Sequence, residues 1–186
     1  MTSLRERIAG ERRRLREVRQ KLTAAVNQKS SGNPDWIPFY IAAADYVEAS
    51  MGRMHAQDVK MGDMIREKVE TMDDNVVKAL GELDERLSEN DKRLKRVLAA
   101  RDRLRNGDTD AIGEFEAAAK DFTDYVIANM GHHGATTELA GRLFSAEDWE
   151  YMAGVTDEDM AREVALFERV TETTPADLDL SEVEAA

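Results

Sequence analysis

Only three histidines occur in this chain of 186 residues, and two of them are adjacent. His132 and His133 lie between Gly131 and Gly134, and Glu138 follows five residues after His133. Imidazole nitrogens together with carboxylate oxygens suit iron, manganese or zinc rather than copper(I) or calcium. The segment is therefore the first candidate for a metal site. We expect His133 and Glu138 to be ligands, with His132 as a second choice.

The third histidine, His55, lies far upstream and is followed three residues later by Asp58. On a helix this spacing places the two side chains one turn apart and pointing the same way. Glu48 falls on the same face, so we expect His55 and Asp58 to be ligands and Glu48 to be a further choice. A metal-free alternative stays open. In it His55 and Asp58 lie at the edge of an apolar stripe, and the two adjacent histidines lie in a solvent-facing turn.

These residues must be positioned by helices, because apolar residues recur at spacings of three and four along most of the chain. No alternating pattern of useful length predicts a strand. Capping residues predict two further short helices, which start at Ser145 and Thr156. The glycines around the adjacent histidines should weaken or kink the fourth helix. The long helices are expected at residues 3–27, 36–72, 74–106 and 110–130, with a resumption at 137–144.

Short connections near residues 73 and 107 force neighbouring helices to run in opposite directions. We therefore predict an all-α fold, an antiparallel up-and-down helical bundle with an extra amino-terminal helix and short carboxy-terminal helices. Either residues 3–27 or residues 145–171 complete the set of long helices. The expected organisation is a basic helical arm and linker (1–30), a bundle domain (31–172) and an acidic disordered tail (173–186).

Charge is unevenly distributed along the chain, whose formal net charge is −12. Residues 1–30 carry nine Lys and Arg against three Glu, a net of +6, which leaves −18 for residues 31–186. An acidic body repels nucleic acid and anionic membranes, so neither is expected as its partner. The arm could bind either of them, but no aromatic residue interleaves with its arginines. We expect its narrow apolar stripe to pack on the acidic body, or on its twin in a coiled-coil homodimer.

Several other classes of protein are excluded by composition. The chain has no cysteine, which excludes disulfides, thiolate metal sites and a cysteine nucleophile. No segment approaches the roughly 20 apolar residues that span a bilayer. The amino terminus lacks the apolar region of a secretory signal, so a cytoplasmic location is expected. Phosphate-binding glycine loops and serine-hydrolase motifs are also absent from the sequence.

The segment 122–138, followed by 143–149, resembles the last bundle helix of hemerythrin-like (HHE) proteins. Those helices carry a histidine, a carboxylate four or five residues later and then a short acidic helix start, and His133 to Glu138 matches that spacing. His55 would stand for the histidine of an early helix. The resemblance spans residues 36–153 and implies a four-helix bundle. Residues 74–106 contain no histidine where the family has one, so the implied site is carboxylate-rich or mononuclear.

The expected function is therefore a hemerythrin-like bundle that binds a non-haem metal through histidines and carboxylates. The resemblance implies iron, as a di-iron or mononuclear centre, for sensing or handling of oxygen, peroxide or iron. The alternative is a metal-free helical interaction or dimerisation module. An oxidative enzyme would need an open metal position and a substrate pocket, and the sequence alone indicates neither.

Overall fold

The computed structural model describes residues 4–129 and 134–181, and every regular element within these ranges is a helix. The long helices are α1 (Leu4–Gln28), α2 (Ile37–Lys68), α3 (Asp74–Arg105) and α4 (Ile112–Ala128). Three shorter ones follow: α5 (Gly134–Leu143), α6 (Ala146–Met152) and α7 (Asp157–Thr173). The expected all-α fold is confirmed. None of the helices in these ranges is long and apolar enough to cross a lipid bilayer.

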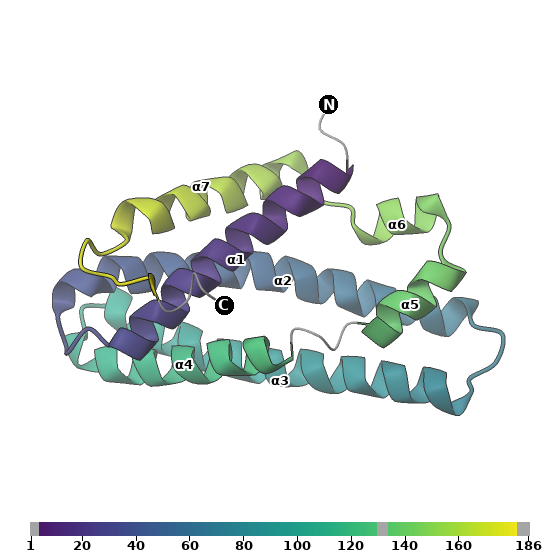
Figure 1. Ribbon diagram of the computed structural model, residues 1–186, viewed down its shortest axis with the longest axis horizontal. Coiled ribbons are helices and arrows are strands. Elements are labelled where there is room, and N and C mark those ends of the chain that lie inside the picture. The colour runs from purple at the N-terminus through teal and green to yellow at the C-terminus, as the bar shows by residue number, and fades with distance from the viewer. Residues whose placement is uncertain (1–3, 130–133, 182–186) are drawn as a thin grey trace.

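Helices α1 to α4 form a closed ring in which each helix contacts its two neighbours. Figure 1 shows that successive helices run in opposite directions and that α1 crosses the bundle obliquely. Helix α7 packs on α2 and α1, whereas α5 and α6 pack at the other end of the long hairpin made by α2 and α3. Both the amino-terminal helix and the last helix therefore contribute to the bundle.

Several helical elements begin at a capping side chain. Asn33 accepts a hydrogen bond from the backbone N–H of Asp35 at 3.0 Å, and this cap opens a 3₁₀ turn, η1 (Pro34–Trp36), before α2. Ser145 forms a complete capping box with Asp148 at the start of α6. The Thr156 side chain caps α7 in the expected way.

The connections differ from the sequence-based boundaries by a few residues. Helix α2 ends at Lys68 rather than at residue 72, because the backbone of Val69 is extended, with ψ of 128°. Asp73 then accepts two backbone N–H bonds as the cap of α3. Gly107 ends α3 with φ of 88°, a conformation that favours glycine, and a 3₁₀ turn, η2 (Thr109–Ala111), precedes α4. Residues 130–133, where a kink was expected, lie outside the described residues.

The buried apolar side chains form two separate clusters. The larger cluster is built from α1, the first half of α2, the second half of α3, α4 and α7. The smaller one joins the far ends of α2 and α3 to α5 and α6, around Met61, Ile65 and Ala140. Residues 52–60 of α2 contribute to neither cluster. The middle of the longest hairpin is therefore more polar than its two ends.

Helix α1 is part of the main core rather than an appended arm. Val18, Leu22 and Ala25 are fully buried in the larger cluster, as the apolar stripe predicted. The chain after α7, expected to be disordered, folds back onto α1 up to Ser181. The Gln28 side chain bonds the backbone of this segment, and Leu178 packs against the core.

The turn between α1 and η1 is fixed by one buried carboxylate, that of Glu116 on α4. Its Oε1 accepts hydrogen bonds from the Tyr40 hydroxyl at 2.7 Å, the Ser30 N–H at 2.8 Å and the Ser30 hydroxyl at 2.6 Å. Lys29 and Ser31, on either side of Ser30, have φ of 61° and 54°, which is unfavourable for residues other than glycine. Glu116 therefore stabilises a strained turn and joins it to α2 and α4.

Replacement of Glu116 by alanine should lower the free energy of unfolding by about 3 kcal/mol, because three buried donors lose their acceptor. Tyr40→Phe, which removes one of these bonds, should cost about 1 kcal/mol. Urea denaturation followed by circular dichroism measures both changes. Glu114→Ala, on the exposed side of the same helix, is the matched control. Equal losses for Glu114→Ala and Glu116→Ala would contradict this role.

Candidate functional site

His55 and Asp58 lie one turn apart on α2, within the polar stretch between the two apolar clusters. Both residues are half-buried. Nη2 of Arg86, a buried residue on α3, lies 3.5 Å from the Asp58 carboxylate. This distance is long for a charge-assisted hydrogen bond. The structure therefore places an imidazole and a loosely paired carboxylate on one face of one helix.

The remaining candidate ligands do not join this pair in the described structure. Glu48 is hydrogen-bonded to Arg101 of α3, and the exposed Glu138 is hydrogen-bonded to Arg142 on its own helix. His132 and His133 lie outside the described residues. Within residues 4–129 and 134–181, no group of three or more histidines and acidic residues is placed to hold a metal ion.

A buried ion-pair cluster that the sequence analysis missed joins α1, α2 and α7. Arg53 donates from Nε and Nη2 to the two oxygens of Glu163, at 2.5 and 3.1 Å. Its Nη1 also lies 3.2 Å from the carboxylate of Glu11, another buried residue. Residues 53 and 163 are far apart in sequence and lie on helices with many other charges, so spacing alone gave no signal of this pairing.

The electrostatics of this cluster follow from its burial. Burial lowers the pKa of Arg53, but the hydrogen bonds and charge of Glu163 outweigh that effect and leave the pKa above its ordinary value. Burial, followed by the negative charge of Glu163, raises the pKa of the nearby Tyr46 to about 12. Arg53 is therefore charged and Tyr46 is neutral near pH 7.

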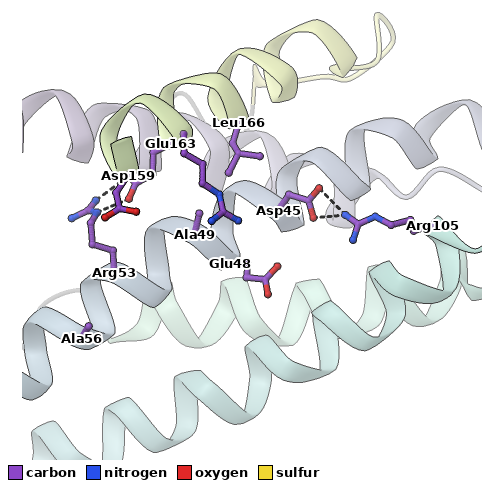
Figure 2. A pocket seen from close by; sticks show the side chains of 10 residues that line it. Asp45, Glu48, Ala49, Arg53, Ala56, Arg105, Asp159, Glu163 and Leu166 are labelled. Atoms are coloured by element: carbon purple, nitrogen blue, oxygen red, sulfur yellow. Dashed lines mark hydrogen bonds and ion pairs between the residues drawn. The ribbon is translucent and has the colours of Figure 1, made fainter. Parts of the chain in front are cut away.

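An open groove of about 680 Å³ lies beside this cluster, between α2 and α7. Figure 2 shows the pair Arg53–Glu163 at one end of the groove and the pair Asp45–Arg105, with distances of 2.5 and 2.7 Å, at the other. Most acidic side chains along it therefore already bind a guanidinium. We interpret the groove as a charged interface between two packed helices rather than as a substrate pocket.

Helix α1 exposes a basic face on the side away from the core. Arg12, Arg13 and Arg16 are exposed, and none of them has an acidic partner in the part of the chain that the structure describes. Burial and the charge of Arg16 lower the pKa of the adjacent Arg19. Elsewhere arginines are typically paired, as Arg103 is with Asp108. We call Arg12, Arg13 and Arg16 the arginine face of α1.

Comparison with known proteins adds no relative to this description. No family model, no curated protein and no solved structure matches the chain. Three places in the structure bear on its function: the His55–Asp58 pair, the Arg53 cluster and the arginine face.

Arg53→Met and Glu163→Leu should each destabilise the protein by about 3 to 5 kcal/mol, because each leaves a buried charge without its partner. The double variant should lose less than the sum, since both single variants lose the same Arg53–Glu163 interaction, and Glu11 keeps its pairing with Arg7. Chemical denaturation of all four proteins in this double-mutant cycle measures the coupling. Additive losses would show that the two side chains do not interact in solution.

Proposed function

We propose that this protein is a helical interaction module whose arginine face on α1 binds an acidic surface of a partner protein. The observation that carries the proposal is the arginine face itself. Three exposed guanidinium groups lie within two turns of one helix and have no acidic partner in the described structure. A partner that supplies carboxylates would relieve their mutual repulsion and form charge-assisted hydrogen bonds.

The rest of the bundle supports an interaction surface that is rigid before it binds. Val18 and Leu22 anchor α1 in the main core, and the buried Glu11 ties the same helix to Arg53 of α2. A partner therefore does not have to order the helix that it meets, which removes one cost of binding. The acidic remainder of the chain, with a formal charge of −18 over residues 31–186, repels nucleic acid and favours a protein partner. A second copy of this chain is one such acidic protein.

Replacement of Arg12, Arg13 and Arg16 by glutamate should weaken binding of fluorescent poly-L-glutamate by at least about tenfold at low salt, because each substitution replaces an attraction by a repulsion. Fluorescence anisotropy measures the affinity, which should fall as salt rises. Sedimentation of the wild-type chain and the variant under the same conditions shows whether a second copy is the partner. Self-association that is lost in the variant would identify it.

A matched control is available on α3. Lys92, Lys95 and Arg96 are also exposed, but each already has an acidic partner, in Glu89, Asp91 and Asp121 respectively. The same triple change to glutamate at these positions should alter poly-L-glutamate binding by less than about twofold. Equal losses in the two variants, or no binding by the wild-type chain, would refute the arginine face as a docking surface.

A second candidate function is metal binding of the hemerythrin-like kind, with iron as the expected metal. One observation favours it: His55 and Asp58 are half-buried and share a face of α2, in the polar stretch that separates the two apolar clusters. A ligand set would need further groups, for which His132, His133 and Glu138 are the candidates in the sequence. Such a centre would handle or sense oxygen, peroxide or iron.

If this second function is correct, protein purified without chelator should contain stoichiometric metal, and His55→Ala should remove it. Elemental analysis measures the content, and the ultraviolet and visible spectrum reports ligand-to-metal absorption. The metal should also raise the melting temperature of the wild-type chain but not of His55→Ala, because only a folded site binds it. Gln57→Ala, two residues away on another face of α2, is the control. Metal-free protein that gains no stability from added iron, manganese or zinc would exclude this candidate.

A further inference from the structure

The segment after α7 binds the end of α1 through one side chain, that of Gln28. The Gln28 amide donates from Nε2 to the carbonyl of Asp177 at 3.0 Å, and its Oε1 accepts from the N–H of Asp179 at 2.9 Å. These two backbone groups flank Leu178, whose side chain packs against the main core. Gln28 therefore bonds the backbone on both sides of one apolar anchor.

This arrangement selects a type of segment rather than one particular sequence. The Gln28 amide bonds only backbone groups of the segment. It therefore requires a free carbonyl before the anchor residue and a free N–H after it, whatever the neighbouring side chains are. The anchor position requires an apolar residue, which is leucine here. Asp177 and Asp179 are exposed on either side of it, and the Asp179 carboxylate accepts a hydrogen bond from the N–H of Ser181 in its own segment. The contacts therefore fit a segment with a central leucine, held by its backbone.

The chain's own segment is held weakly enough to be replaced. Both of its hydrogen bonds to Gln28 are solvent-exposed, so water can replace each of them at little cost in free energy. Leu178 is only half-buried. The segment follows Thr174, where the backbone leaves the helical conformation with ψ of 123°, and Pro175 comes next. The junction therefore allows the segment to leave without unfolding α7.

We propose that Gln28 and the core surface beneath Leu178 form a docking site for a leucine-centred segment of a partner protein, and that residues 176–180 occupy this site in the free chain. The site is separate from the arginine face on the same helix, so it extends the proposed interaction function by a second surface. The tethered segment competes with the partner, because its covalent link gives it a high local concentration.

The test uses full-length chains and a synthetic peptide with the sequence of residues 174–181, capped at both ends. Leu178→Ala releases the tethered segment, so this variant should bind the peptide at least about tenfold more tightly than the wild-type chain. Asp179→Pro is a second releasing variant, because it removes the N–H that Gln28 accepts. Nuclear magnetic resonance titration measures the affinity and follows the Gln28 side-chain amide directly. Melting curves verify that each variant is folded.

Gln28→Ala, added to Leu178→Ala, should lower peptide affinity by at least about tenfold, whereas Asn27→Ala in the same background should not. A peptide with alanine in place of its central leucine should bind poorly to every chain. The triple glutamate variant of the arginine face should still bind the peptide, which separates this proposal from the preceding one. If both releasing variants fold but do not bind the peptide, or if Gln28→Ala has no effect, the proposal is wrong.

Discussion

The bundle depends on the neutralisation of Arg53, because this guanidinium lies where α1, α2 and α7 meet. A buried cation without partners would cost several kcal/mol, so the positions of Glu163 and Glu11 are constrained by it. The two carboxylates come from opposite ends of the chain. Their convergence fixes the rotation of α1 and α7 about their own axes, and with it the side of α1 that remains exposed. The surface available to partners thus follows from an internal charge balance.

The helices were predictable from the sequence because their apolar spacing and their caps are local properties. Ser145 and Thr156 cap helices in the structure as the sequence indicated, and Gly107 lies in the short connection that was predicted near residue 107. The predicted positions of the helix ends were less accurate where two local preferences compete. The extended backbone of Val69, for example, ends α2 four residues before its apolar pattern predicts.

The candidate site was less predictable, because a histidine or a carboxylate has several ways to be satisfied. Glu48 lies on the same face of α2 as the candidate ligands, but an arginine from α3 binds it in the structure. That pairing joins positions 48 and 101, and no spacing rule within one helix can detect it. The Arg53 cluster was missed for the same reason. His55 and Asp58 keep their predicted adjacency only because both lie on one helix.

The division of the interior into two apolar clusters implies that the molecule does not open as one unit. The smaller cluster depends on α5 and α6, and α6 contributes no fully buried side chain. Amides at that end should exchange with solvent through partial openings that leave the four-helix ring closed. The end of the α2–α3 hairpin near α5 and α6 is then a region of low local stability. Changes of conformation or sequence there should have little effect on the stability of the larger apolar cluster.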